Sequence, residues 1–281
     1  MNLLTKVVGK LPGSWIKAVS RAQWRHPLLK YAFDWCAAML RNEDAEIQQG
    51  VGKGLRFNPG HANAGYVLGT SEPAVQSALK ACLRPGMIVY DVGANVGFHT
   101  VIAARLVGPS GCVVSFEPLA SNARQVEYNA RLNGLTHVIV RCEALGATNG
   151  EARFLVSAER TLGKLASSDS TVSGKIGEIM VPVWRLDDLL AQGGMPRPDL
   201  IKIDVEGAEC DVLAGAAKTL RTSRPILMIE LHGTNAAVAA ALNALEYHPV
   251  VLGSADTIID SPWDAYVIAA PKERSHETSH P

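Results

Sequence analysis

The residues best able to do chemistry in this chain of 281 residues are acids at the ends of short apolar runs. Such runs are typical of buried parallel strands, whose carboxyl ends form the ligand-binding edge of an α/β sheet. The acids in this position are Asp91, Glu117, Asp204 and Glu230. We therefore expect a binding site for a polar ligand at that edge.

A glycine-punctuated turn follows the first of these acids, in the order Asp91-x-Gly93-x-Asn95-x-Gly97, and precedes an apolar-faced helix. This arrangement is typical of nucleotide-like ligand sites. A dinucleotide site would need G-x-G-x-x-G, but Asn95 and Phe98 occupy its second and third glycine positions. A carboxylate here repels a pyrophosphate and suits a cation, which favours S-adenosylmethionine. Gly93 and Gly97 would let the backbone approach it, and Asp91 would meet its amino group through a water or a backbone amide.

Two later strand ends supply residues for the rest of such a nucleoside. Glu117 stands twenty residues after Gly97, where a carboxylate can accept both ribose hydroxyls. Glu143 could accept from the exocyclic amine of adenine, and Ala144 or Leu145 could pack against its ring. The alternatives are a solvated strand-end charge at Glu117 and an exposed loop acid at Glu143.

The groups expected to carry the reaction follow two further strands. Asp204 and Glu206 lie close in the chain, so mutual repulsion could raise one pKa toward general-base duty. His232, two residues after Glu230, is the best single candidate for a base near neutral pH, although an isolated histidine is more often a structural hydrogen-bonder. Glu209 suits a helix N-terminus. We expect no metal requirement, although Asp204, Glu206, Glu230 and His232 together could hold Mg²⁺ or Mn²⁺.

Alternating strand and helix patterns indicate the elements that position these residues. The expected strands are residues 87–91, 112–117, 138–142, 200–204, 225–231, 249–252 and 265–269. The expected helices are residues 72–83, 98–107, 120–133, 186–191, 209–220 and 234–246. This alternation predicts a doubly wound α/β domain with a mostly parallel sheet of seven strands.

The alternation is interrupted between residues 150 and 183. Residues 152–156 and 179–183 resemble two extra strands, and the unpatterned stretch 157–178 between them is predicted to be a substrate lid. Residues 52–70 read as loop with a short hairpin that pairs 55–57 with 66–68. We divide the chain into an N-terminal helical extension (1–50), the main domain (51–271) and a frayed tail (272–281).

The first 41 residues carry seven Lys and Arg and one acid, with apolar residues at helical spacing. We expect helices that cap the domain, and the alternative is a basic amphipathic surface that touches an anionic membrane. The whole chain has zero net charge, which argues against nucleic-acid binding. Five scattered cysteines and no apolar run of about 18 residues favour a reduced, cytoplasmic setting, with contact to a membrane limited to residues 1–41.

Several motifs together resemble the FkbM-type family of methyltransferases, with similarity over about residues 65–252. They are Tyr90-Asp91-Val92-Gly93-Ala94-Asn95-Val96-Gly97, Phe116-Glu117-Pro118, Ala144-Leu145-Gly146, Arg185-Leu186-Asp187-Asp188, residues 201–209 and Ile229-Glu230-Leu231-His232. The resemblance implies a class I, Rossmann-like fold and S-adenosylmethionine as cofactor, and it adds Pro118 to the cofactor-binding residues. Ser71 departs from the aromatic residue often found at its position.

From residues and resemblance together, we expect O-methylation of a hydroxyl on a sugar, a glycolipid or other lipid-linked glycan, or a secondary metabolite. One alternative is a non-catalytic protein that binds a membrane or a partner through a methyltransferase-like fold. The other is an NAD-dependent oxidoreductase, against which the broken glycine pattern speaks.

Overall fold

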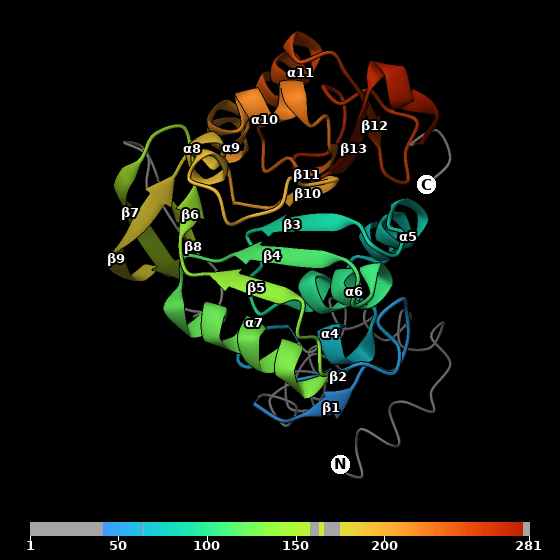
Figure 1. The fold of residues 1–281 in the computed structure, drawn as a ribbon, viewed down its shortest axis with the longest axis vertical. Helices are drawn as coiled ribbons and strands as arrows, with labels where there is room; N and C mark the ends of the chain where they lie inside the picture. Colours follow the sequence, from blue (N-terminus) through green and yellow to red (C-terminus); the bar gives the residue numbers. More distant parts are fainter. Residues whose placement is uncertain (1–41, 64, 158–162, 166–174, 278–281) are drawn as a thin grey trace, which may run out of the picture.

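The computed structural model describes residues 42–63, 65–157, 163–165 and 175–277. Its centre is a seven-stranded sheet in the order β12-β13-β11-β10-β3-β4-β5 (Figure 1). The strands are β3 (Ile88–Val92), β4 (Cys112–Phe116), β5 (Val138–Arg141), β10 (Leu200–Ile203), β11 (Ile226–Glu230), β12 (Tyr247–Val251) and β13 (Tyr266–Pro271). β13 pairs antiparallel with both neighbours, and the other pairings in this sheet are parallel. The predicted seven-stranded, mostly parallel sheet is confirmed.

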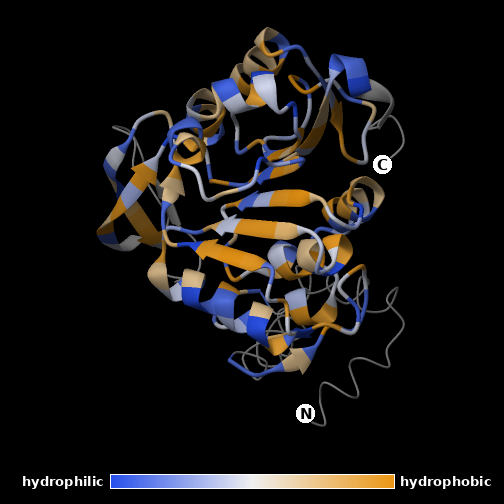
Figure 2. Cartoon of the chain, in the orientation of Figure 1, coloured by the Kyte–Doolittle hydropathy of each residue, from blue (hydrophilic) through white to orange (hydrophobic). Residues whose placement is uncertain are grey.

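Helices cover both faces of this sheet, as a doubly wound fold requires. α5 (Pro73–Cys82) and α6 (Phe98–Val107) share one apolar cluster with β3, and α7 (Ala120–Leu132) packs beside α6. α8 (Leu186–Ala191), α9 (Glu209–Gly215), α10 (Ala217–Thr222) and α11 (Asn235–Ala244) share the cluster on the opposite face. The central strands are apolar along most of their length in Figure 2, because both faces are covered. None of the helices in the described ranges is long and apolar enough to cross a membrane.

A second sheet projects from the end of the first and contains the two predicted extra strands. Its order is β6-β9-β7-β8, with β6 (Ala144–Leu145), β7 (Gly150–Ser157), β8 (Gly163–Leu165) and β9 (Lys175–Trp184). β7 and β9 pair antiparallel over most of their length. The predicted lid falls largely on residues 158–162 and 166–174, outside those described.

The hairpin predicted within residues 52–70 is wrong. β2 (Arg56–Phe57) pairs with β1 (Ala45–Glu46), and Gly65–Leu68 forms the short helix α4. The Asn63 side chain starts this turn, because its Oδ1 accepts a hydrogen bond of 2.8 Å from the Gly65 N–H. The helical turn also places Tyr66 in a stack on Phe98, with the ring centroids 4.7 Å apart.

The chain ends and one helix also differ from expectation. The predicted N-terminal helices fall on residues 1–41, outside those described, whereas Ile47 is fully buried in the main domain. The tail is not frayed throughout, because Lys272–Glu277 forms the 3₁₀ helix η1 and Glu273 bonds Arg224 at 2.8 Å. The single helix predicted over 209–220 is broken into α9 and α10. A Cβ on Gly215 would lie 2.0 Å from the Gly146 carbonyl oxygen, so this approach requires glycine.

Candidate active site

A cavity of about 210 Å³ opens at the carboxyl ends of β3, β4, β10 and β11. It is lined by nine of the residues predicted from the sequence, namely Gly93, Asn95, Glu117, Pro118, Ala144, Leu145, Asp204, Glu206 and Glu230. Three of the predicted cofactor-binding residues do not line it, and they are Asp91, Gly97 and Glu143. His232 does not line it either, but lies directly behind its acidic wall.

The loop after β3 supplies the floor of the cavity. Gly93 adopts a φ of +80°, and a Cβ there would lie 1.8 Å from the Asp204 carbonyl oxygen. Gly97 has a φ of +87° where α6 begins, and a Cβ there would lie 3.1 Å from Val126 of α7. The two glycines therefore have different roles: Gly93 brings β3 and β10 together at the cavity, and Gly97 lets two helices pack.

Glu117 fits the predicted role in binding a ribose. It is 5% exposed, and its two carboxylate oxygens accept backbone N–H bonds from Asn95 at 2.8 Å and from Leu119 at 2.9 Å. Burial raises the pKa of Glu117 to about 8, although these two bonds act in the opposite direction. The carboxylate is thus fixed in place at the cavity wall, where each oxygen retains a lone pair for a hydroxyl donor.

The neighbouring wall is apolar and suits a flat ring. Ala144 and Leu145 come from β6, and Phe154 comes from β7 of the second sheet. Glu143 does not join them, because its carboxylate is held by the Arg141 guanidinium. The expected contact between Glu143 and an adenine amine is therefore not favoured by this geometry.

Asp91 is placed behind the cavity rather than in it. Its carboxylate accepts a 2.6 Å hydrogen bond from Thr100 and lies 3.3 Å from the Lys202 ammonium group. Lys202 is 2% exposed and also lies 3.2 Å from Asp204. Burial lowers the pKa of Lys202, but Asp204 and Asp91 outweigh it and the net direction is upward. Asp91 therefore positions Lys202, and its expected contact with a ligand amino group through a water or a backbone amide stays a prediction.

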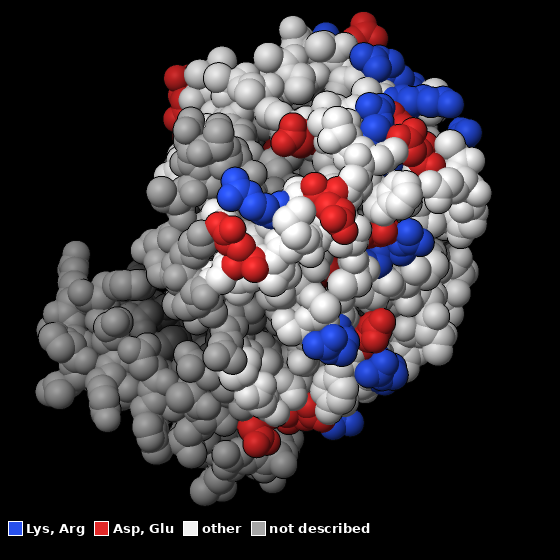
Figure 3. All heavy atoms as spheres, turned by 90° about the vertical axis from the view of Figure 1, so that its left-hand side faces the viewer, with Lys and Arg blue, Asp and Glu red and all other residues white. Residues whose placement is uncertain are grey.

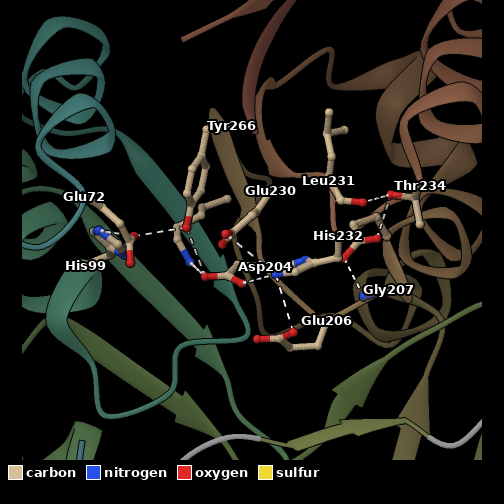
Figure 4. Close-up of polar contacts among 12 residues, drawn as sticks. Glu72, His99, Asp204, Glu206, Gly207, Glu230, Leu231, His232, Thr234 and Tyr266 are labelled. Carbon is tan, nitrogen blue, oxygen red and sulfur yellow. Dashed lines mark hydrogen bonds and ion pairs between the residues drawn. The ribbon is translucent and has the colours of Figure 1, made fainter. Parts of the chain in front are cut away.

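The opposite end of the cavity is strongly acidic. Glu72, Asp204, Glu206 and Glu230 all line it. The Tyr266 hydroxyl donates to Glu72 at 3.0 Å and lies 3.3 Å from Asp204, so it links two of these carboxylates (Figure 4). Burial and the charge of Asp204 raise the pKa of Glu230. Burial also raises the pKa of Asp204, but the charges of Lys202 and His232 together have the larger, opposite effect. The net pKa of Asp204 therefore lies below its ordinary value.

His232 points from the end of β11 into this acidic cluster (Figure 4). Its Nε2 lies 3.6 Å from Glu206, 3.7 Å from Glu230 and 3.9 Å from Asp204. Its Nδ1 lies 3.0 Å from Oε1 of Glu209, which is fully buried. Burial lowers the pKa of His232, but Glu209 and the other three carboxylates raise it to about 9.

This environment corrects two expectations. His232 is not a base of ordinary pKa near neutrality, because the free protein favours its imidazolium form. Glu209 does more than complement a helix N-terminus, since it binds His232, the Thr234 hydroxyl at 2.9 Å and the Gly207 N–H at 2.8 Å. Glu209 thereby holds the imidazole with Nε2 directed at the cavity wall.

Backbone strain is concentrated at the same place. Seven non-glycine residues in the described ranges have a positive φ, and four of them belong to this site. They are Glu72, Asn95, Glu206 and His232. Because this conformation costs of order 1–3 kcal/mol per residue, it persists where the surroundings impose it and is typical of functional sites.

The sequence matches a known protein family over most of the central sheet. The family described as "Methyltransferase FkbM domain" matches residues 91–250, more than half of the sequence. The chain belongs to the FkbM methyltransferase family. The match begins within β3, contains β4, β5, β10 and β11, ends within β12 and leaves out β13. The class I, Rossmann-like fold expected from the motifs is thus confirmed together with the family.

Three relatives illustrate the range of this family. NoeI of Sinorhizobium fredii, named 2-O-methyltransferase, is 48% identical over 157 residues, which are 50% of this chain and 62% of NoeI. FkbM of Streptomyces tacrolimicus, named 31-O-demethyl-FK506 methyltransferase, is 27% identical over 192 residues, which are 59% of this chain and 73% of FkbM. AglP of Haloferax volcanii, named hexuronic acid methyltransferase, is 26% identical over 145 residues, 52% of this chain and 56% of AglP. The chain thus spans little more than half the length of AglP.

Sequence reasoning missed several residues of this FkbM-family site, among them Tyr66, Glu72 and Phe154. Tyr66 and Glu72 line the cavity from α4 and from the N-cap of α5, whereas the sequence predicts only a hairpin strand at Tyr66 and the start of a helix at Glu72. Phe154 carries no local signal, because only the fold of the second sheet brings it to the cavity.

The same cluster contains the groups that could hold a metal ion. Donor atoms of Asp204, Glu230 and His232 lie within 4.8 Å of one another. Carboxylate oxygens and an imidazole nitrogen suit Mg²⁺ or Mn²⁺. The charge of these acids is already partly balanced by Lys202 and by the protonated His232.

Proposed function

We propose that this protein is an S-adenosylmethionine-dependent O-methyltransferase that acts on a hydroxyl of a sugar, a lipid-linked glycan or a secondary metabolite. The observation that carries the proposal is the polarity of the cavity. A fixed carboxylate at Glu117 is followed by an apolar wall, and the far end holds four carboxylates. That sequence of environments suits a nucleoside whose tail carries a sulfonium and an ammonium group.

Each wall has a role in holding this cofactor. Glu117 would accept the ribose hydroxyls, while Pro118, Ala144, Leu145 and Phe154 would pack around the adenine ring. Gly93 and Asn95 would let the backbone pass close to the ligand. Glu72, Asp204 and Glu230 would stabilise its positive charge. Bound S-adenosylmethionine supplies the methyl group as an activated sulfonium substituent.

The chain's own task in the reaction is to orient a hydroxyl and to remove its proton. Asp204 and Glu206 offer acceptors for the hydroxyl at the acidic wall. His232 would receive the proton at Nε2, and Glu209 would stabilise the imidazolium that results, in the manner of a carboxylate-oriented histidine base. The arrival of a cationic cofactor beside these groups favours loss of the proton that His232 holds in the free protein.

The direct test is a search for the acceptor with a labelled donor. Extracts of glycans and small metabolites are incubated with the protein and with S-adenosylmethionine that carries a CD₃ group. We expect a new species with the mass of one added CD₃, and we expect it to be absent for Glu117→Ala. Clear cofactor binding without labelled product from any hydroxyl compound would instead favour a non-catalytic, ligand-binding protein.

A further inference from the structure

One large aromatic side chain stands exposed beside the acidic cluster. Trp263 lies in the connection between β12 and β13, and 64% of it is exposed. The centroid of its ring lies 6.1 Å from that of His232, with 58° between the two planes. His232 in turn contacts Asp204, Glu206 and Glu230 at the cavity wall. Trp263 therefore lies next to His232, the proposed base, and one side chain away from the carboxylates of the cavity wall.

The backbone that carries this indole is firmly held. The Gly233 N–H donates to the Trp263 carbonyl at 2.7 Å. The Asn235 side chain donates to the carbonyls of Ile258 at 3.1 Å and Ser261 at 2.9 Å, so α11 anchors the connection on its other side. Exposure of an indole to water is unfavourable. Because the backbone here is held by hydrogen bonds, the exposure of Trp263 is not the result of a loose loop. A rigid aromatic face next to a site is suited to contact a ligand.

The surroundings indicate the chemistry of that ligand. Residues 253–264 contain Asp256, Asp260 and Asp264 and no Lys or Arg. This acidic segment repels phosphates, uronates and anionic lipid headgroups. An uncharged pyranose ring fits instead, because its apolar C–H face can pack on the electron-rich indole while its hydroxyls donate to carboxylates.

We infer that Trp263 is the stacking platform for the methyl acceptor and that the acceptor presents an uncharged pyranoside ring. This inference rests on the proposed methyltransferase function and narrows its substrate class. The ring lies against Trp263, and one of its hydroxyls reaches Nε2 of His232 and the carboxylates of Asp204 and Glu206. Trp263 thus sets acceptor affinity and does not take part in cofactor binding.

The test compares four proteins: wild type, Trp263→Ala, Trp263→Phe and Ile259→Ala. Ile259 is the matched control, because it is 63% exposed in the same connection but has no aromatic ring on which a sugar could stack. The acceptors are methyl fucoside, methyl rhamnoside, methyl glucoside and methyl glucuronoside, all as pyranosides. Methyl transfer is followed by mass, and binding of S-adenosylhomocysteine is measured by calorimetry.

We expect Trp263→Ala to raise the KM for the best neutral pyranoside by about tenfold, the size of effect that an aromatic contact supplies. Trp263→Phe should restore most of the affinity, Ile259→Ala should match wild type, and the glucuronoside should be the poorest acceptor. Binding of S-adenosylhomocysteine should not change in any variant.

Three outcomes would overturn the inference while the proposed function stands. They are a KM for Trp263→Ala within twofold of wild type, a preference for the glucuronoside, and, in the search with the CD₃ donor, labelled product only from hydroxyls outside sugar rings. A Trp263-dependent attachment to phosphatidylcholine vesicles with an unchanged KM would also assign this surface to lipid. Failure of every protein to bind S-adenosylhomocysteine would refute the proposed function itself.

Discussion

Glu117 and Asp91 both belong to parallel strand ends, yet their surroundings give them different roles. Asp91 faces the buried Lys202 and serves the interior of the site. Glu117 faces the cavity, and two backbone N–H groups hold its oxygens in place. The position at a strand end therefore predicts only that a carboxylate lies near the ligand edge of the sheet. A buried cationic partner, as at Asp91, turns it into a structural group, and the lack of such a partner at Glu117 within the described ranges leaves it facing the cavity.

The raised pKa of Glu117 predicts a pH dependence of nucleoside binding. The free protein holds this group protonated below about pH 8, whereas two ribose hydroxyls need a carboxylate that accepts from both. Binding therefore releases a proton, and the affinity should rise as pH increases from 6 to 8.5, by up to about tenfold per unit below the pKa. The probe is 5′-methylthioadenosine, since it lacks a titrating amino group, and calorimetry measures its Kd.

Glu117→Gln provides the control for this experiment. The amide does not titrate in this range and offers one acceptor oxygen, so its Kd should be weaker at pH 8.5 and flat across the series. A wild-type Kd that is flat, or a Gln variant that keeps the slope, would remove Glu117 from the ribose site.

His232 should matter for turnover and not for cofactor binding. His232→Ala removes the group proposed to take the proton, so kcat should fall by about 100-fold or more. Binding of S-adenosylhomocysteine should stay within about twofold of wild type, because His232 does not line the cavity. His248→Ala, at an exposed histidine on β12, is the control and should behave as wild type. Wild-type turnover in His232→Ala would end the role of His232 as the base.

Removal of metal ions should leave the activity unchanged. Lys202 and the protonated His232 already compensate Asp204, Glu206 and Glu230, so the cluster does not require a cation for charge balance. The test is the initial rate before and after treatment with EDTA and dialysis. A loss of rate that Mg²⁺ or Mn²⁺ restores would show instead that Asp204, Glu230 and His232 bind a metal.

At the scale of elements, the approach of β3 and β10 at Gly93 fixes the floor of the cavity. Gly93→Ala should cost more stability than Gly54→Ala, because both glycines have a positive φ but only Gly93 faces a backbone atom within 4 Å. The shared strain is about 1–2 kcal/mol, and the contact with Asp204 should add about 2 kcal/mol or more. Urea unfolding of the two variants measures the difference. Equal losses would mean that the loop moves aside without cost.

Local patterns were sufficient for the main sheet and for part of the site. Apolar runs, glycine turns and helical spacing predict β3, β4, β10 and β11. Once these strands are placed, the acids that follow them are placed at the ligand edge of the sheet. Glu72 and Phe154 could not be found in this way, because α5 and the second sheet reach the cavity only through tertiary packing. The environment of His232 was also hidden, since Glu209 is distant in the sequence and its burial sets the orientation of the imidazole.

At the scale of the whole molecule, charge is divided along the chain. Residues 1–41 carry a net charge of +6, so the neutral total leaves a net charge of −6 on the remaining residues. On the face drawn in Figure 3, basic and acidic side chains are interspersed, whereas the cavity gathers Glu72, Asp204, Glu206 and Glu230 at one end. This acidic end favours the approach of a cationic cofactor over that of a dinucleotide, which carries two phosphates.

Calorimetric titration of the intact protein with S-adenosylhomocysteine and with NAD⁺ therefore tests the central claim most directly. S-Adenosylhomocysteine shares the adenosine and the amino-acid tail that the two ends of the cavity are proposed to bind. We predict saturable binding of one equivalent, strongly weakened by Glu117→Ala, and no binding of NAD⁺ at the same concentrations. Binding of NAD⁺ with no heat from S-adenosylhomocysteine, or an unchanged Kd in Glu117→Ala, would contradict the account.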